Sequence, residues 1–303
     1  MSSPIFTMMC GVPGSGKSSK AQQIKANFPN TIIVSPDDIR GELYGDVNDQ
    51  EHNTEVFDVA KQRVRDGLKN NHDVILDATN VNSKRRKAFL WSIEDILCYK
   101  RAVIMATPIE ICLRRNWCRQ RRIPDEVIFR MYRSWQTPAS WEGWDDIEVV
   151  TYKDNQFKSD LMDYYLAAFT YFNYDQNNPW HSQTLGKHIL GVGDYVLNHG
   201  GSYDVITAAL YHDIGKPFCR TTDENGISHY YGHENVGAYD MLVRGNNLNV
   251  SLLVNYHMYP LHWKNNDYPE RVHDKYRKLW GDDFYNDIML LHEADVHAGH
   301  VEL

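Results

Sequence analysis

One octapeptide constrains the fold of this chain more than any other feature. Residues 11–18 read GVPGSGKS and match the pattern GxxxxGK[ST] at every fixed position. They follow the apolar run Ile5–Cys10, which is typical of a buried strand, and they precede a helix-like stretch at 18–28. In this setting glycines let main-chain N–H groups curl around phosphates, and the helix start adds the positive end of its dipole. The octapeptide therefore predicts an α/β domain that binds nucleotide phosphates.

The same loop supplies the expected nucleotide-binding residues. Lys17 should reach the β- and γ-phosphates, and the Ser18 hydroxyl should bind Mg²⁺. We therefore expect ATP or another NTP, with Mg²⁺, as the cofactor of this domain. The predicted nucleotide-binding residues are Gly11, Gly14, Ser15, Gly16, Lys17, Ser18 and Ser19. A chance match in a glycine-rich turn is the alternative, and the flanking strand and helix argue against it.

The first half of the chain alternates short apolar runs with helix-length polar segments. Such alternation is typical of a parallel sheet with helices on both faces. The expected strands are Ile5–Cys10, Thr31–Val34, Val74–Leu76, Ala102–Met105 and Ile147–Val150. Helix-like stretches lie near 18–28, 51–70, 83–97, 109–121 and 125–135. The sequence therefore predicts an α/β phosphate-loop NTPase domain.

The pattern changes near residues 150–156, where strand signals fade and helical spacing takes over. Expected helices lie near 157–175, 184–198, 203–213, 233–244, 249–257 and 284–297. Polar or proline-containing loops are expected at 221–231 and 259–270. We therefore predict two domains, residues 1–152 and an all-α domain of residues 153–303.

Composition limits the class of protein without naming a substrate. The 303 residues suffice for two domains, and the net charge of −8 is not that of a typical nucleic-acid binder. Basic residues nevertheless cluster at 84–87 and 114–122, and a solvated helix face is the alternative explanation for the first cluster. No apolar run is long enough for a bilayer, the N-terminus lacks a basic signal region, and the five cysteines include no CxxC pair. A cytoplasmic protein without membrane contact is expected.

Charged residues follow the second expected strand, at the sheet edge where ligands of parallel sheets bind. Asp37, Asp38 and Arg40 lie in SPDDIR. One aspartate is a candidate base for the acceptor hydroxyl, and Arg40 is a candidate for holding an acceptor phosphate. The alternative is that the two aspartates cap the following helix.

Two further segments carry polar groups to the same edge. Asp77-Ala78-Thr79-Asn80 follows the third strand, and RRNWCRQRR at 114–122 is typical of an arginine lid. Arg115 and Arg119 stand four residues apart, so on one helix they would share a face and could both contact nucleotide phosphates.

Together, the segments GVPGSGKSS, SPDDIR, DATN, RNWCRQRR and IPDEVIFRMY resemble the kinase domain of phage T4-type polynucleotide 5′-kinases over residues 5–150. The resemblance implies that Asp37 is the general base and that Arg40 contacts the acceptor. Lys17, Ser18 and the lid residues Arg115 and Arg119 carry over directly. Thr79-Asn80 corresponds to the Thr-Asn of the family's third-strand motif, from which this chain departs by inserting Ala78 after Asp77. Asp38, Thr79 and Asn80 are expected to contact substrate.

The second half contains an ordered set of histidines and aspartates. His212-Asp213 lies in HDIGK at the end of an apolar helix, with His188 before it and His233, His257 and Asp295 after it. A single such residue would more often be a satisfied core histidine. The order H…HD…H…H…D resembles the HD superfamily of metal-dependent phosphohydrolases over about residues 178–300.

The HD resemblance implies a ligand set for one or two divalent metals. One metal would take His188, His212, Asp213 and Asp295, and a second would take His233 and His257 with Asp213 as a bridge. Imidazole and carboxylate ligands suit Mn, Fe, Co, Ni or Zn. Lys216 is placed to neutralise phosphate charge, and His181 is a candidate substrate contact, with a structural role as its alternative.

The combined hypothesis is a bifunctional enzyme that heals nucleic-acid ends, with RNA favoured over DNA by analogy with phage and bacterial RNA repair. One site would phosphorylate a 5′-OH, and the other would remove a 3′-phosphate or 2′,3′-cyclic phosphate, which prepares both ends for an RNA ligase. A nucleoside kinase fused to a nucleotide phosphohydrolase would instead prefer free nucleosides. A non-catalytic NTP-switched sensor would be insensitive to Asp37→Ala.

Overall fold

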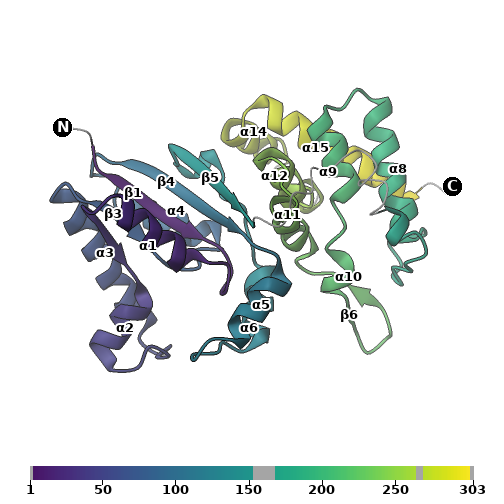
Figure 1. Ribbon diagram of the computed structural model, residues 1–303. Helices are drawn as coiled ribbons and strands as arrows, with labels where there is room; N and C mark the ends of the chain where they lie inside the picture. Colours follow the sequence, from purple (N-terminus) through teal and green to yellow (C-terminus); the bar gives the residue numbers. More distant parts are fainter. Residues whose placement is uncertain (1–2, 153–167, 264–268, 301–303) are drawn as a thin grey trace. The chain divides into compact units, whose positions relative to one another are not determined.

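The computed structural model describes residues 3–152, 168–263 and 269–300 (Figure 1). The chain divides into two compact units. The first contains Met1–Ile128 and Pro138–Tyr152, and the second contains Phe129–Thr137 and Lys153–Leu303. The expected helix near 157–175 lies largely outside the described residues.

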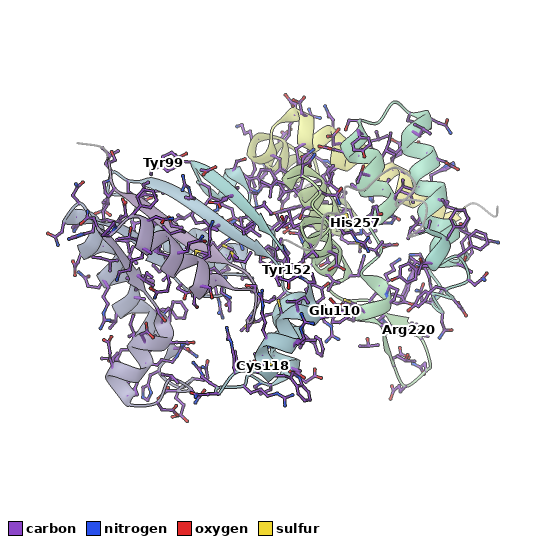
Figure 2. The ribbon with its side chains drawn as sticks, viewed as in Figure 1. Tyr99, Glu110, Cys118, Tyr152, Arg220 and His257 are labelled. Carbon is purple, nitrogen blue, oxygen red and sulfur yellow. The ribbon has the colours of Figure 1, made fainter. Side chains whose placement is uncertain are left out.

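The first unit is built on a five-stranded sheet with the order β2-β3-β1-β4-β5. All of its paired strands are parallel, with Met8 of β1 opposite Leu76 of β3 and Ala102 of β4. The strands are β1 (Ile5–Cys10), β2 (Thr31–Val34), β3 (Asp73–Leu76), β4 (Tyr99–Ala106) and β5 (Asp146–Thr151). Figure 2 labels Tyr99 at the start of β4 and Tyr152 just after β5, at opposite ends of the sheet. The parallel sheet predicted from the sequence is confirmed.

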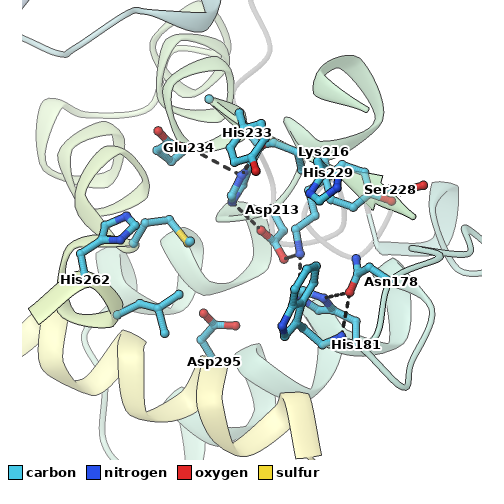
Figure 3. A pocket seen from close by; sticks show the side chains of 16 residues that line it. Asn178, His181, Asp213, Lys216, Ser228, His229, His233, Glu234, His262 and Asp295 are labelled. Atoms are coloured by element: carbon cyan, nitrogen blue, oxygen red, sulfur yellow. Dashed lines mark hydrogen bonds and ion pairs between the residues drawn. The ribbon is translucent and has the colours of Figure 1, made fainter. Parts of the chain in front are cut away.

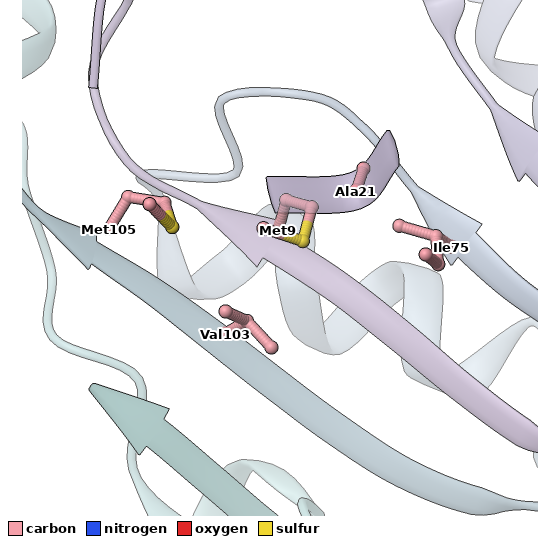
Figure 4. Packing of buried hydrophobic residues seen from close by; sticks show 5 residues of the cluster. All are labelled: Met9, Ala21, Ile75, Val103 and Met105. Atoms are coloured by element: carbon pink, nitrogen blue, oxygen red, sulfur yellow. The ribbon is translucent and has the colours of Figure 1, made fainter. Parts of the chain in front are cut away.

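Apolar side chains cover both faces of this sheet. Successive strand residues point to opposite faces, so Phe6 and Met9 of β1 lie on different sides. Met9 packs with Ala21 of α1 and Val103 of β4 (Figure 4), whereas Phe6 stacks on Phe89 of α4 at a centroid distance of 5.7 Å. The helices are α1 (Lys17–Asn27), α2 (Pro36–Tyr44), α3 (Asn53–Lys69), α4 (Ser83–Trp91) and α5 (Ile109–Trp117), with a short 3-10 helix η1 (Ser140–Glu142).

Two predicted helices are too long. The helix expected over 83–97 ends at Trp91 as α4, and the second error changes the geometry of the arginine-rich segment. The helix expected over 109–121 ends at Trp117 as α5. The side chain of Asn116 explains the end, because its Nδ2 donates to the Ile123 carbonyl at 2.7 Å and its Oδ1 accepts from the Ile123 amide at 3.0 Å. These bonds fold residues 118–123 back on the helix. Arg119 therefore lies beyond the helix that carries Arg115, and the shared-face argument was wrong.

The second unit is helical, as predicted. Its described helices include α8 (Leu185–Asn198), α9 (Tyr203–Tyr211), α10 (Lys216–Cys219), α11 (His233–Val243), α12 (Leu248–Tyr256), α13 (Tyr259–Trp263), α14 (Pro269–Trp280) and α15 (Asp282–His300). The loop expected at 221–231 contains a hairpin of β6 (Thr221–Thr222) and β7 (Ser228–His229). Its turn is built by Asp223, whose carboxylate accepts from the amides of Asn225 and Ile227. The helix α14 was not predicted, because its apolar residues are sparse.

Residues 129–137 pack inside the second unit although they precede β5 in the chain. They comprise the end of α6 (Asp125–Arg133) and the segment after it. Tyr132 meets the ring of Tyr239 edge to face at 5.3 Å and donates to Asp240. The Thr137 amide donates to Asn255 Oδ1 at 2.9 Å. In the parts of the chain that the structure describes, no helix combines the length and apolarity needed to cross a membrane.

Candidate nucleotide site and candidate metal centre

The phosphate loop joins β1 to α1 and is held by the segments on either side of it. A side chain at Gly14, whose φ is +85°, would place its Cβ 2.4 Å from the Cys112 carbonyl oxygen of α5. The Thr107 hydroxyl donates to the Ser15 carbonyl at 2.9 Å. Only glycine fits at position 14, because both the backbone conformation and the close approach exclude a Cβ. Ser18 and Ser19 are exposed on the first turn of α1.

Lys17 is buried beneath this loop. Its Nζ donates to the Val12 carbonyl at 3.0 Å. Burial lowers the pKa of Lys17 to about 8, while the Asp77 carboxylate raises it and the Arg119 guanidinium lowers it further. Asp77 and Arg119 therefore lie within electrostatic reach of Lys17. Phosphate groups bound in the loop would place negative charge next to this buried ammonium and so stabilise its charged form.

The arginine-rich segment contributes a second contact with the loop. Arg115 Nη1 donates to the Gly14 carbonyl at 3.1 Å, and its guanidinium lies 5.3 Å from the centre of the Tyr152 ring. The Arg119 side chain is exposed. Figure 2 labels Cys118, the C-cap of α5, which stands between Arg115 on the helix and Arg119 beyond it.

Asp37 lies in the first turn of α2, and its carboxylate binds two guanidinium groups. Arg40 Nη1 donates to Oδ1 at 2.7 Å, and Arg121 Nη1 donates to Oδ2 at 3.0 Å. The cap of α2 is Ser35, whose hydroxyl accepts from the Asp38 amide at 3.3 Å. Capping therefore does not account for the Asp37 carboxylate. Asp38 is exposed beside it.

Sequence reasoning missed Arg121 as a second partner of this carboxylate and Asn53 as a partner of Arg40. Arg40 is buried and its Nη2 donates to Asn53 Oδ1 at 2.6 Å. Arg121 also donates to Asn48 Oδ1 at 2.7 Å and to the Val47 carbonyl at 2.8 Å. Arg121 was overlooked because the helical spacing argument selected Arg115 and Arg119 instead.

The segment after β3 braces the phosphate loop through its main chain. The Gly11 amide donates to the Thr79 carbonyl at 2.9 Å, and Asn80 Nδ2 donates to the Met9 carbonyl at 2.7 Å. The Asn80 carbonyl in turn accepts from Arg86 Nη1 at 2.9 Å. The Thr79 and Asn80 side chains are half-buried at the carboxyl edge of the sheet, with the Asn80 amide engaged by β1.

Six predicted ligands of the second unit come together from five helical segments. His188 lies on α8, His212-Asp213 follow α9, His233 begins α11, His257 follows α12 and Asp295 lies on α15. Gly215 permits this convergence, because an added Cβ would lie 2.1 Å from the His233 carbonyl oxygen. The apolar helices thus bury five of the six ligands, and Asp295 remains partly open to the pocket.

The carboxylate of Asp213 stands between two groups of donors. Its Oδ2 lies 3.4 Å from His188 Nε2 and 3.2 Å from His212 Nε2. Its Oδ1 lies 3.1 Å from His233 Nε2 and 3.9 Å from His257 Nε2. Asp295 Oδ1 completes the first group, 3.0 Å from His188 Nε2. Two clusters of potential ligand atoms therefore share one bridging carboxylate.

Hydrogen bonds orient three of the imidazoles for cation binding. The Nδ1 atoms of His212, His233 and His257 lie 2.7, 2.9 and 2.7 Å from the carbonyls of residues 209, 230 and 254. Because a carbonyl only accepts, each Nδ1 must donate, and the lone pair of the neutral ring then lies on Nε2. In His188 the buried Nδ1 has no hydrogen-bond partner among the described residues.

The charges of the cluster favour a bound cation. Burial alone would lower the pKa of His212, but Asp213 and Asp295 outweigh it and raise that pKa to about 10. Burial, reinforced by His212 and His233, lowers the pKa of His257 to about 3. The raised pKa favours a protonated His212 beside the carboxylates of Asp213 and Asp295, and the lowered pKa favours a neutral His257. A divalent metal could replace that proton, and the oxygen and nitrogen donors fit such an ion.

A cavity of about 360 Å³ opens beside the cluster and carries a cation on its floor. Lys216 Nζ lies 2.6 Å from Asp213 Oδ2 and 3.0 Å from His181 Nε2, and it donates to Gln176 Oε1 at 2.8 Å. Figure 3 shows Asp213 between His233 and Lys216, with His262 across the pocket from His181. Gln176 and His262 carried no signal in the sequence, because neither belongs to a recognisable motif.

Comparisons with known proteins agree with this architecture. Residues 6–138 match the family model described as an AAA domain, and residues 185–298 match the model described as an HD domain. The chain therefore combines an α/β domain of phosphate-loop kinase fold with a helical HD domain. A kinase domain joined to an HD hydrolase domain indicates an enzyme.

Individual relatives cover parts of the chain. The L-seryl-tRNA(Sec) kinase of Methanococcus maripaludis is 34% identical over 155 residues, which are 48% of this chain and 59% of that protein. A chain of the Pnkp1/Rnl/Hen1 RNA repair complex is 25% identical with a TM-score of 0.41, covering 44% of each chain. A fungal RNA kinase structure is 13% identical with a TM-score of 0.38, covering 50% of this chain and 38% of that one. The match thus spans about three fifths of the curated relative.

Proposed function

We propose that this protein heals RNA ends, phosphorylating 5′-hydroxyls with ATP or another NTP and removing 3′-phosphates or 2′,3′-cyclic phosphates. Residues 1–152 would carry the first activity and residues 153–303 the second. The observation that supports the proposal best is the Asp213 carboxylate between two donor groups, next to the cation Lys216. A phosphohydrolase centre and a kinase on one chain make complementary changes to the two ends of a break, which an RNA ligase could then join.

In the kinase domain, Asp37 would take the proton of the acceptor 5′-OH. The hydroxyl oxygen forms a bond to the γ-phosphorus, the bond to the β-phosphate oxygen breaks, and the nucleoside diphosphate leaves with those electrons. Arg40 holds Asp37 at 2.7 Å and so fixes the direction of its carboxylate. Lys17 and Arg119 would neutralise charge on the transferred group, Arg115 would support the loop, and Mg²⁺ would bind Ser18.

In the HD domain, His188, His212, Asp213 and Asp295 would hold one divalent metal, and His233, His257 and Asp213 a second. Such metals supply charge neutralisation of the phosphate and acidify a water molecule. Lys216 would donate to a phosphate oxygen, and His181, which Lys216 contacts at 3.0 Å, would orient the same group.

The test offers an RNA oligomer with a 5′-OH and a 3′-phosphate, together with ATP and a panel of divalent metals. Lys17→Ala and Asp37→Asn should lower 5′-phosphorylation by about 10²- to 10⁴-fold and leave removal of the 3′-phosphate intact. Asp213→Ala should do the reverse. Asp58→Asn and His199→Ala change exposed residues away from both sites and serve as controls. Loss of both activities in any one of the three variants would contradict the division into two sites.

The seryl-tRNA kinase is a second candidate for the kinase domain, favoured by 34% identity over 155 residues. Its acceptor, the seryl hydroxyl, is a primary alcohol carried by an RNA, as a 5′-OH is. Asp37 could serve either acceptor. A competition between seryl-tRNA and a 5′-OH oligomer at equal concentration decides between them, because our proposal requires the larger kcat/KM on the 5′-OH end.

A further inference from the structure

The pocket beside the metal centre has an aromatic wall that the hydrolytic chemistry does not require. Trp180 and Tyr231 line this pocket with 63% and 78% of their surfaces exposed. The ring of His229 stacks on Tyr231 with centroids 5.6 Å apart and planes 5° apart. It also lies 6.2 Å from the Trp180 ring, at 52°. Three flat rings therefore gather in one pocket, and two of them leave broad faces open to a ligand.

Hydrogen bonds hold this aromatic wall by its edges and main chain. His229 Nε2 lies 3.1 Å from Asp223 Oδ2, and the Trp180 amide donates to Asn178 Oδ1 at 3.1 Å. The Ser228 amide donates to the Asn177 carbonyl at 2.9 Å, which ties the hairpin to the loop before Trp180. None of these bonds occupies a ring face. A wall already ordered by such bonds loses little conformational entropy when a flat ligand stacks on it.

In the rest of the pocket, polar and apolar side chains form two separate groups. Lys216 and His181 stand with the metal ligands on the floor, where they suit a phosphate. Met258 and Leu261 line the pocket together with the aromatic wall, and methionine adapts readily to ligands of different outline. The volume of about 360 Å³ is near the lower end of ligand pockets, which are roughly 300–1,000 Å³. The pocket therefore has room for one nucleotide.

We propose that Trp180, His229 and Tyr231 form a stacking site for the base of the terminal nucleotide whose phosphate is removed. This inference rests on the proposed phosphohydrolase function and names its substrate as a phosphate that adjoins a nucleobase. Stacking accepts every base, because every base has a π-face. Recognition at this site is consequently independent of RNA sequence, as an end-healing activity requires. A base-free sugar phosphate would bind the floor alone.

The turnover test compares an RNA 3′-phosphate end that carries a base with the same end made abasic. Trp180→Ala and Tyr231→Ala should each lower kcat/KM on the base-bearing end by about 5- to 100-fold and leave the abasic end unchanged. Trp180→Phe and Tyr231→Phe should restore most of the loss, because a flat ring remains. Tyr203→Ala, an exposed aromatic outside the pocket, is the matched control. Equal losses on both ends, or no loss on either, would overturn the stacking site.

A binding test does not depend on turnover. An oligomer with 2-aminopurine at its 3′-phosphate end should lose fluorescence on binding the wild type and Tyr203→Ala, and keep it with Trp180→Ala. Absence of quenching in the wild type overturns the stacking site, whatever the enzyme hydrolyses. Quenching without hydrolysis of any 3′-phosphate end leaves the stacking site in place and refutes the proposed phosphatase activity instead.

Discussion

The pair Arg86–Glu142 offers the sharpest test of how the kinase fold supports its site. Both side chains are fully buried, with Arg86 Nε 2.8 Å from Glu142 Oε2 and Nη2 2.6 Å from Oε1. Trp144 Nε1 also donates to Glu142 Oε2 at 3.0 Å. Arg86 further donates to the Asn80 carbonyl, and Asn80 reaches the strand before the phosphate loop. A solvated helix face was one of the two explanations for the basic residues at 84–87; positions 84, 85 and 87 are exposed, whereas Arg86 is buried.

Arg86→Met removes one partner and leaves the Glu142 carboxylate buried without its countercharge. Breaking a buried pair in this way costs about 3–5 kcal/mol. For a unit of this size each kcal/mol lowers Tm by about 2–4 °C, so the kinase unit should melt about 6–20 °C earlier. Calorimetry would measure this, with the kinase transition identified by its upward shift when ATP and Mg²⁺ are added. The KM for ATP should rise as well, because Asn80 loses a bond that braces the loop.

Arg85→Met is the matched control, since Arg85 is the exposed neighbour on the same helix. It should change stability by no more than about 0.5 kcal/mol. The double variant Arg86→Met/Glu142→Met should be more stable than Arg86→Met alone, because no unpaired charge stays buried. Equal melting of Arg86→Met and Arg85→Met would refute the reasoning.

Three further predictions concern the metal centre and the lid. Gly215→Ala should reduce metal content measured by plasma mass spectrometry, because its Cβ would lie 2.1 Å from the His233 carbonyl; Gly299→Ala, with open space around it, should not. Stripping the metal with a chelator should destabilise the HD unit by about 2.7 kcal/mol if the metal had been present at a hundred times its Kd, and denaturation with and without added metal measures this. Maleimide should label exposed Cys118 at pH 8 and spare Cys10, because burial raises the pKa of the Cys10 thiol to about 12. Bound nucleotide should slow the labelling of Cys118; an unchanged rate would contradict the assignment of this segment as a lid.

The sequence predicted the local parts of the kinase domain well. The octapeptide at 11–18, the strand before it and the helix after it are neighbours in the chain, so their geometry follows from local rules. The parallel sheet followed from the alternation of elements. The prediction of a helix through Arg119 was wrong, because the side chain of Asn116 forms hydrogen bonds with the main chain of Ile123 and folds the chain back. No hydrophobic pattern encodes such a bond.

For the candidate metal centre too, the sequence indicated which residues belong together, whereas the structure decided how they are arranged. Through its resemblance to the HD superfamily, the order of six candidate ligands along the chain predicted that they act together, and the structure brings them together. These residues are His188, His212, Asp213, His233, His257 and Asp295. Only the tertiary structure assigns the two oxygens of Asp213 to different donor groups, because this depends on how five helical segments pack. The partners Gln176 and Lys216 likewise meet only through that packing.

What the sequence determined by itself is therefore the two kinds of domain, since motifs and periodicities are properties of neighbouring residues. It also named most of the residues that the structure gathers at the two candidate sites. The tertiary structure alone decided that Arg86 is buried against Glu142, that residues 129–137 pack with the second unit, and that Trp180 and Tyr231 share a pocket. Each of these three features depends on contacts between residues far apart in the chain, or on which face of a helix is buried. Such contacts form only where the whole core closes, because burial is a property of the packed molecule and not of any segment.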